Sequence, residues 1–214
     1  MSQKIDEDKS GLKKFISFGW VYELVQFVAG ANMYRTKMVQ DYIKPFEGCK
    51  ILDIGCGTGE YVRFLDKFCK QYEYYGFDSE ANYIERGKSL FKNRPEIHLH
   101  QQILTADTVK EIGEFDIVIA IGVMHHMSDE VVLSLLNTAY AALKPGGRLV
   151  TYDPGRFENE KFMETFFAKY DRGRNIRSQG NYAKLIAKVF SDFKGFEPML
   201  TYYPSRNVVF ECVK

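Results

Sequence analysis

Alternating glycines and two carboxylates form the pattern with the most chemical meaning in this 214-residue sequence. The segment ILDIGCGTGE, residues 51–60, runs from an apolar stretch into a glycine-rich turn, and a helical pattern follows it. Asp78 lies 19 residues beyond Gly59, at the end of a second apolar stretch. This layout is typical of a nucleotide-binding βαβ unit, in which the turn approaches the ligand and the acid binds a ribose.

Two details of the turn favour a cationic ligand over a dinucleotide. The dinucleotide fingerprint G-x-G-x-x-G fails, because its third glycine would fall at Glu60 and instead comes one residue earlier, at Gly59. Asp53 precedes the turn and would repel a pyrophosphate, and the turn contains no Lys or Arg to offset that charge. S-adenosylmethionine fits such a site, since it carries an ammonium, a sulfonium and no phosphate. A dinucleotide-dependent oxidoreductase is therefore disfavoured.

Four segments resemble, in their order and spacing, the motifs of the class I S-adenosylmethionine-dependent methyltransferases. They are the turn itself, YGFD at 75–78, FDIVIAIGVMHH at 115–126 and LKPGGRL at 143–149. The resemblance covers roughly residues 48–153. It implies a Rossmann-like domain that transfers a methyl group from S-adenosylmethionine and releases S-adenosylhomocysteine.

The resemblance also implies cofactor contacts. Asp53 is expected near the amino acid end of the cofactor, and Asp78 on the ribose hydroxyls. Many family members carry an Asp after the third strand for the adenine amino group, whereas Gln101 and Gln102 offer amide oxygens here. A tyrosine or arginine in an N-terminal lid often reaches the methionine carboxylate, although a solvated helix-face Arg35 is an equal alternative. The expected cofactor residues are Asp53, Gly55, Cys56, Gly57, Gly59, Asp78, Ser79, Gln102, Gly122, Tyr34 and Arg35.

Two histidines, His125 and His126, follow the predicted fourth strand, where the carboxyl edge of a parallel sheet forms a ligand crevice. A neutral imidazole there can accept a proton from a hydroxyl or amine substrate. His126 matches a histidine that is common in the resembling group, so it is the preferred candidate and His125 the second. Partly buried structural histidines are the alternative. Neither an H-x-x-x-H spacing nor a third ligand accompanies them, so no metal is predicted.

A basic segment after Asp153 is the candidate substrate site. Residues 169–188 contain six Lys or Arg and one acid, Asp171. The resemblance places substrate recognition here, with a looser likeness to bacterial methyltransferases of surface-polysaccharide or small-metabolite synthesis. Arginines suit bidentate binding of phosphate or carboxylate, and a solvated charged face is the alternative. The expected substrate residues are Asp153, Arg172, Arg174 and Arg177.

The elements that must position these residues alternate between strand and helix patterns. They predict an α/β fold with a doubly wound, mostly parallel, seven-stranded sheet, a C-terminal antiparallel hairpin and an N-terminal helical lid. Strands are predicted at 50–54, 72–77, 97–101, 115–121, 147–152, 196–203 and 207–213. Helices are predicted at 58–68, 80–92, 129–143, 158–170 and 182–190, with one or two more over 12–44.

Length and composition predict one domain over residues 1–214, and the resemblance implies that it is a methyltransferase domain. Its parts are a tail and lid (1–45), a cofactor core (48–153), a substrate-side insertion and helix (154–190) and the hairpin (194–214). No signal peptide or membrane span is apparent, and four cysteines without metal spacing suggest reduced thiols in a cytoplasmic protein.

The acceptor expected from these features is an oxygen or nitrogen of a small molecule, such as a sugar or an anionic metabolite. The net charge of +1 argues against nonspecific nucleic-acid binding. An RNA or protein methyltransferase and a non-catalytic cofactor-binding regulator are the alternatives, and the oligomeric state is open.

Overall fold

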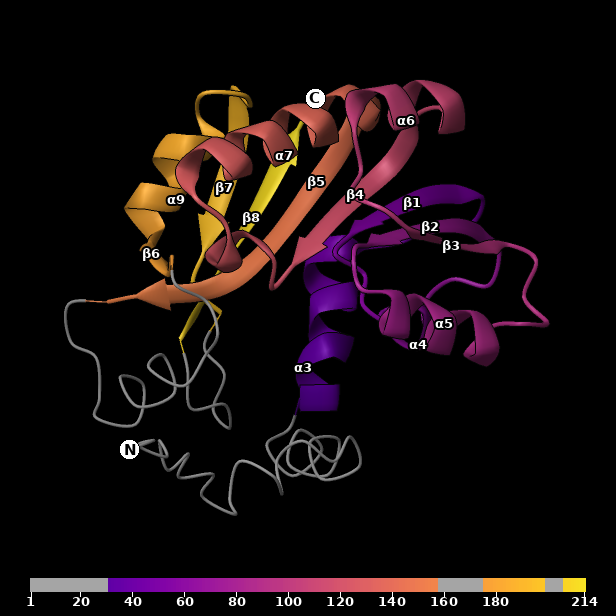
Figure 1. The fold of residues 1–214 in the computed structure, drawn as a ribbon. Coiled ribbons are helices and arrows are strands. Elements are labelled where there is room, and N and C mark those ends of the chain that lie inside the picture. Colours follow the sequence, from indigo (N-terminus) through magenta and orange to yellow (C-terminus); the bar gives the residue numbers. More distant parts are fainter. Residues whose placement is uncertain (1–30, 158–174, 199–205) are drawn as a thin grey trace, which may run out of the picture.

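The computed structural model describes residues 31–157, 175–198 and 206–214, which contain a mixed β-sheet (Figure 1). The main strand order is β3-β2-β1-β4-β5-β8-β7, and a short strand, β6, pairs with β5 off this path. This order confirms the predicted doubly wound sheet, to which β6 is an unpredicted addition. The strands are β1 Cys49–Ile54, β2 Tyr72–Asp78, β3 Ile97–Gln101, β4 Phe115–Ile121, β5 Leu143–Arg156, β6 Arg177–Ser178, β7 Asp192–Phe196 and β8 Asn207–Val213.

Strand direction gathers the candidate residues at one edge of the sheet. The strands β1 to β5 run parallel to their neighbours, and β8 runs antiparallel to both β5 and β7. The predicted C-terminal antiparallel pairing is thus confirmed. Because the carboxyl ends of parallel strands meet at one edge, the turn after β1, Asp78, the loop after β4 and Asp153 lie along the same side.

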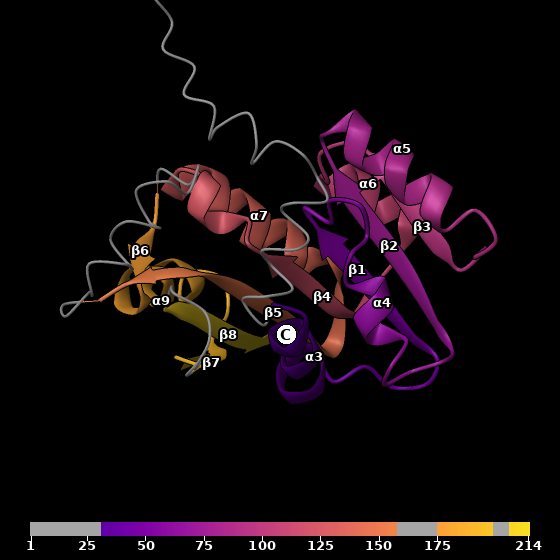
Figure 2. The same ribbon diagram turned by 90° about the horizontal axis from the view of Figure 1, so that it is seen from below.

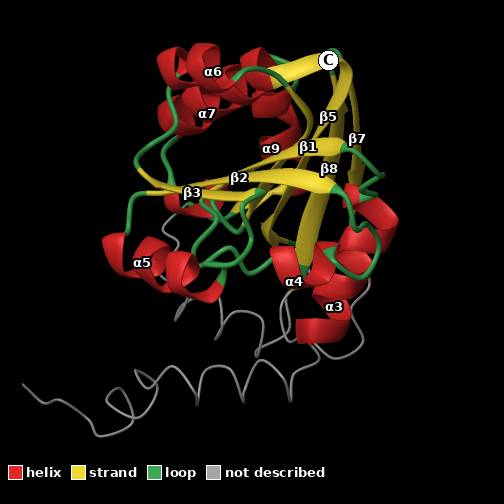
Figure 3. Ribbon diagram, turned by 90° about the vertical axis from the view of Figure 1, so that its right-hand side faces the viewer, coloured by secondary structure: helices red, strands yellow, loops and turns green. Residues whose placement is uncertain are grey.

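Helices cover both faces of the sheet (Figure 3). On one face, α6 (Ala106–Ile112), α7 (Asp129–Ala142) and α9 (Gln179–Ile186) bury their apolar sides in a core with β4 and β5. On the other face, η1 (Val39–Ile43), α4 (Val62–Leu65) and α5 (Ala81–Leu90) share a second core with β1 and β2. A parallel strand buried on both faces needs a continuous apolar run, which explains the CKILDI sequence of β1.

The N-terminal lid is described only from α3 (Ala31–Met38), which continues into the π-helical turn η1. Residues 12–30 of the predicted lid lie outside the described residues, as does the predicted helix at 158–170. The described part of the lid meets the sheet near its carboxyl edge. The ring of Tyr34 in α3 packs at a tilt against that of Tyr152, with centroids 4.8 Å apart, and Tyr152 pairs with the last residue of β4.

Several predicted boundaries differ from the structure for local reasons. The helix predicted at 58–68 is reduced to α4, because Gly59 has a φ of 75° and so cannot continue a right-handed helix. The helix α6 was missed. It is short, and Thr105 caps it by accepting a hydrogen bond from Thr108 N. Ser178 caps α9 in the same way, so this helix begins before the predicted residue 182.

The strand predicted at residues 196–203 begins earlier in the structure. It corresponds to β7, which covers Asp192–Phe196, and Phe196 pairs with Val209 of β8. Residues 199–203 of the predicted strand lie outside the described residues.

Candidate active site

The glycine turn after β1 combines close packing with open space. Gly55, Gly57 and Gly59 have φ values of 76°, 56° and 75°, in the left-handed region that favours glycine. A Cβ at Gly55 would lie 2.6 Å from Val123 Cγ2 in the loop after β4, whereas a Cβ at Gly57 would meet nothing within 4 Å. The turn thus packs against the β4 loop at Gly55 and leaves room for a ligand at Gly57.

Asp78 at the end of β2 holds this turn and keeps acceptor capacity. Its Oδ2 accepts a hydrogen bond from Gly57 N at 2.9 Å, and its Oδ1 accepts one from Glu80 N at 2.9 Å. A carboxylate has about four lone-pair sites, and this one is partly exposed. It can therefore also accept from two vicinal hydroxyls, as a ribose contact requires.

Asp53 is a buried acid beneath the turn. It is 2% exposed, and Tyr74 Oη donates to its Oδ2 at 2.5 Å. Burial raises the pKa of Asp53 to about 7, the hydrogen bond from Tyr74 opposes that rise, and the charge of Asp78 adds to it. A ligand cation nearby would favour the charged carboxylate. The sequence did not indicate Tyr74, whose position in the middle of a predicted strand reads as ordinary core.

The lid residues lie against the same turn. Arg35 of α3 forms an ion pair with Glu60, with Nη2 and Oε2 2.9 Å apart, and Glu60 directly follows Gly59. Tyr61 is buried beside this pair, and burial raises the pKa of its hydroxyl while the charge of Arg35 opposes that rise. A basic side chain and several tyrosine rings therefore border the turn on the side of α3.

A short polar contact joins His125 in the loop after β4 to Asp153 in β5. His125 Nδ1 lies 2.7 Å from Asp153 Oδ1, and the same oxygen accepts from His125 N at 3.0 Å. His125 is 5% exposed and Asp153 is fully buried. Burial raises the pKa of Asp153, and the hydrogen bond and charge of the His125 ring oppose that rise. Asp153, which was predicted to contact the substrate, therefore contacts the ring and the backbone N–H of His125.

The preferred histidine of the sequence prediction occupies a different environment. His126 is exposed, and its ring centroid lies 3.8 Å from that of His125. Both histidines belong to the short helix η2 (Met124–His126). The ring of His125 contacts the Asp153 carboxylate directly, so the geometry favours the second choice of the sequence prediction. Neighbouring strands position the two residues, since His125 follows β4 and Asp153 lies in β5, but the sequence did not indicate their contact.

Arg177, predicted to bind a substrate anion, is engaged by the protein. Its side chain is buried, pairs with Asp129, and donates to three carbonyl oxygens, those of Met124, Met127 and Asn175. These contacts hold the guanidinium against the protein. Arg172 and Arg174 lie outside the described residues.

The remaining predicted cofactor residues border the same edge. Burial raises the pKa of the Cys56 thiol, and its Sγ contacts Gly57 O, so the thiol acts as a small filler. Ser79 and Gln102 are exposed, and Gln102 donates to Thr108 Oγ1 at 3.3 Å. Gly122 has a φ of 69° and its N–H donates to Tyr152 O at 2.6 Å, which fixes the start of the β4 loop.

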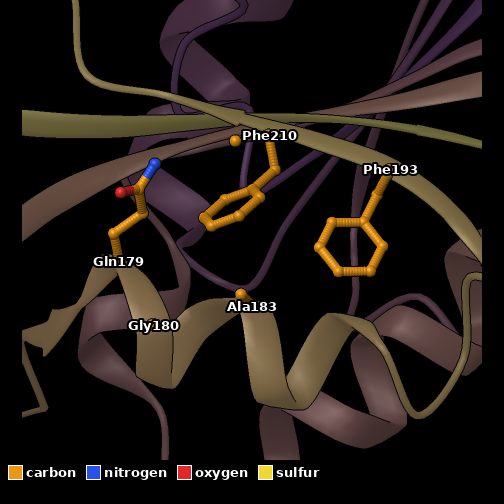
Figure 4. A pocket seen from close by; sticks show the side chains of 6 residues that line it. Gln179, Gly180, Ala183, Phe193 and Phe210 are labelled. Atoms are coloured by element: carbon orange, nitrogen blue, oxygen red, sulfur yellow. The ribbon is translucent and has the colours of Figure 1, made fainter.

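A separate hollow of about 220 Å³ lies between α9 and the β7–β8 hairpin (Figure 4). Phe193 and Phe210 face Ala183 and Gly180 across it, with Gln179 and Gly195 completing the lining. None of these six residues can ionise, so the hollow offers no acid or base for chemistry.

Within residues 31–157, 175–198 and 206–214, no three His, Cys, Asp or Glu side chains gather in a way that could hold a metal ion. No helix in these ranges is long and apolar enough to cross a membrane.

Comparison with known proteins finds a matching family model and curated relatives. Residues 51–147 match the family described as methyltransferase domain. The ubiquinone biosynthesis O-methyltransferase of Brucella ovis is 31% identical over 67% of this chain and 56% of its own length. The tRNA U34 carboxymethyltransferase of Pseudoalteromonas translucida is 26% identical over 67% of this chain and 40% of its own length. The chain thus spans about half the length of these curated relatives.

Solved structures show the same fold. The plantazolicin methyltransferase BamL, in complex with a substrate analogue and S-adenosylhomocysteine, gives a TM-score of 0.66 at 14% identity, over 94% of this chain and 91% of that one. A putative O-methyltransferase from Nostoc punctiforme gives 0.66 at 18% identity, over 87% of this chain and 57% of that one. These neighbours show the fold, and the family match over residues 51–147, together with the glycine turn, supports a class I S-adenosylmethionine-dependent methyltransferase.

Proposed function

We propose that this protein transfers the methyl group of S-adenosylmethionine to a hydroxyl oxygen of a small molecule. The observation that carries the proposal is the 2.7 Å contact between His125 Nδ1 and Asp153 Oδ1 at the carboxyl edge of the sheet. A hydroxyl must lose its proton during methyl transfer, and an imidazole oriented by a carboxylate is suited to accept it. The names of curated relatives from Brucella and Dictyostelium, which are O-methyltransferases, support an oxygen acceptor.

The residues around the turn fit the cofactor. Asp78 would accept from the ribose hydroxyls, Asp53 lies where a buried carboxylate would attract the amino acid ammonium, and Arg35 is the candidate for the methionine carboxylate. The open space at Gly57 lets the cofactor approach the backbone. When bound, S-adenosylmethionine supplies a methyl group already activated by its sulfonium.

His125 would act as the general base. With Asp153 ionised, the carboxylate accepts the proton of Nδ1, and this places the basic lone pair on Nε2. Asp153 also stabilises the imidazolium that forms when Nε2 takes up the acceptor proton. A positioned general base contributes about 10²–10⁴-fold to a rate, which is the size of effect proposed for this pair.

The arginines of the insertion remain a proposal for substrate recognition. Since Arg177 is engaged by the protein, we assign an anionic group of the acceptor to Arg172 or Arg174. Losing one charge-assisted contact should weaken acceptor binding by about 1.5–3 kcal/mol.

The test is a panel of acceptors assayed by release of S-adenosylhomocysteine. It contains phenols, sugars and amines, each as neutral and as phosphorylated or carboxylated forms, together with bulk tRNA. Methylation of hydroxyl acceptors with loss of turnover in His125→Gln is the expected result. Turnover with amines alone, or with tRNA alone, would replace the hydroxyl proposal by nitrogen or RNA methylation. Tight cofactor binding without turnover of any acceptor would favour a non-catalytic regulator.

Arg172→Ala and Arg174→Ala, assayed with the same panel, test whether the acceptor carries an anionic group. The expected result is a higher KM for charged acceptors with unchanged cofactor affinity. Equal methylation of neutral and charged acceptors by both variants would show that these arginines form a solvated face.

A further inference from the structure

Arg177 contacts both elements that hold the His125–Asp153 pair. Its backbone belongs to β6, which pairs with β5 two residues beyond Asp153, at the far end of that strand (Figure 2). Its guanidinium reaches the loop after β4 and donates to Met124 O at 3.0 Å and Met127 O at 2.7 Å. These two carbonyls flank the histidines. One side chain therefore ties the strand of the carboxylate to the loop of the imidazole.

Four hydrogen bonds and an ion pair hold the guanidinium of Arg177. Nε donates to Asp129 Oδ1 at 2.8 Å, and Nη2 lies 2.7 Å from the same oxygen. Nη1 donates to Asn175 O at 2.9 Å in addition to Met124 O, and Nη2 also donates to Met127 O. A guanidinium has five N–H groups in a fixed plane, whereas a lysine has three donors on one nitrogen. The site therefore selects arginine over lysine.

The segment before Arg177 also binds the histidine itself. Asn175 N donates to His125 O at 3.0 Å, while the opposite side of the same residue is held by Asp153. Asp153 Oδ1 accepts from both the backbone N–H and the ring of His125, so a shift of the loop by a fraction of an ångström would lengthen both bonds. The position of the loop thus decides how the imidazole meets the carboxylate.

We propose that Arg177 is a positioning residue, which fixes the His125 loop against β5 so that the imidazole keeps its contact with Asp153. The benefit to catalysis rests on the proposed function, because it requires His125 to be the base. The positioning itself does not, and it can be measured on the free protein. This role replaces the anion contact predicted from the sequence for Arg177.

The experiment measures the tautomer of each imidazole by ¹⁵N NMR in protein labelled at its four histidines. Single His→Gln variants assign the signals. In the wild type, His125 should be a single Nδ1–H tautomer. In Arg177→Met the two tautomers should become comparably populated, and in Arg177→Lys the population should be intermediate, because a lysine can satisfy only some of the carbonyls.

Arg148→Met is the matched control. Arg148 also donates to backbone carbonyls, those of Ile43 and Lys44. It lies nearer the start of β5, on the opposite side of the sheet from the His125–Asp153 pair. Its loss should lower the melting temperature and leave the His125 tautomer unchanged. Each variant is also titrated with S-adenosylhomocysteine. An affinity within twofold of the wild-type value shows that the proposed cofactor site at the glycine turn is intact.

The outcomes separate the two proposals. A folded Arg177→Met whose His125 tautomer equals that of the wild type would overturn the positioning role. If Arg177→Met does not fold, Arg177→Lys decides, and a wild-type tautomer there overturns the proposal equally. Full turnover in His125→Gln would instead overturn the proposed base and leave the result for Arg177 standing.

Discussion

The β1–β2 half and the β4–β5 half of the sheet position their functional groups in different ways. In the first half the contacts are short-range steps of one βαβ unit, such as Gly57 N to Asp78 and Tyr74 to Asp53, each 21 residues apart. In the second half they join segments 28 to 53 residues apart, through His125, Asp153 and Arg177. The proposed cofactor half is therefore held by contacts within one βαβ unit, and the proposed catalytic half by contacts between distant segments.

The largest effect is expected in the catalytic half. His125→Gln and Asp153→Asn should each lower kcat by about 10²–10⁴-fold, because both remove the oriented base. The cofactor half should not respond, so the affinity for S-adenosylhomocysteine, measured by calorimetry, should stay within a few-fold of wild type. The double variant should be little worse than either single one, since the two residues act as a unit.

His126→Gln is the matched control for this prediction. It removes the exposed neighbour and keeps the His125–Asp153 contact, so it should cost far less than His125→Gln. The reverse ranking would return the base to His126, the residue that the sequence favoured.

The second effect belongs to the cofactor half. Asp78→Ala removes an acceptor for two ribose hydroxyls and also the hydrogen bond that holds Gly57 N. Hydrogen bonds to charged groups contribute about 1.5–3 kcal/mol each, so calorimetry should show at least a tenfold loss of affinity for S-adenosylmethionine. The tautomer of His125 should not change. A change there would mean that the two halves are coupled, which breaks the comparison.

The same contrast explains how much the sequence could predict. The glycine turn, Asp53 and Asp78 are local signals, because a strand, a turn with glycines and a strand-end acid must meet in a βαβ unit. The doubly wound, mostly parallel sheet followed from the alternation of strand and helix patterns. These features depend on residues close together in the chain, and the structure has them where they were expected.

The catalytic half needed information that residue types do not carry. The sequence presented Arg177 as one of several clustered arginines, and only the pairing of β6 with β5 brings it under Met124 and Met127. Asp153 was expected to face the substrate, and its contact with His125 depends on the conformation of η2. Likewise, α6 was missed and β7 begins before its predicted start. A cap and the register of the hairpin fix the ends of these elements, and apolar periodicity does not.

A third effect, of about three- to tenfold on affinity, concerns pH. Burial raises the pKa of Asp53 to about 7, so the acid is largely neutral below that pH and loses its attraction for the ammonium of the cofactor. Affinity for S-adenosylmethionine should therefore fall as the pH is lowered from 8 to 6. Asp53→Asn should bind more weakly at pH 8 and show a flatter profile, as calorimetry at the two pH values will test.

The stability of the free protein should change in the opposite sense. Because the folded-state pKa of Asp53 is raised, the folded state binds the proton more tightly than the unfolded state. The stabilisation that protonated Asp53 gives the folded state is fully present below pH 4 and is lost as the pH rises through about 7. The free energy of unfolding should fall by up to about 1.4 kcal/mol per pH unit in this range. Asp53→Asn should lose this slope in urea unfolding. An unchanged slope would show that other groups cause it.

The smallest effects are expected for substitutions of two glycines of the same turn. Gly55→Ala places a Cβ 2.6 Å from Val123 Cγ2 at a φ of 76°, so it should cost about 2–4 kcal/mol in stability through crowding and left-handed strain. Gly57→Ala at a φ of 56° meets no atom within 4 Å and should cost only the strain, about 1–2 kcal/mol. In a protein of this size the latter lowers the melting temperature by a few degrees.

The effect on cofactor affinity should be larger at Gly57 than at Gly55, the reverse of the order expected for stability. The open space at Gly57 is where the cofactor approaches the backbone, so Gly57→Ala should lower the affinity for S-adenosylhomocysteine more than its small effect on melting suggests. In Gly55→Ala the methyl group points at the β4 loop, and the loss of affinity should follow the loss of stability. Thermal melts with and without S-adenosylhomocysteine measure both quantities at once. If the ligand raises the melting temperature of Gly57→Ala as much as that of the wild type, the cofactor does not pass over Gly57, and the turn serves only to pack β1 against β4.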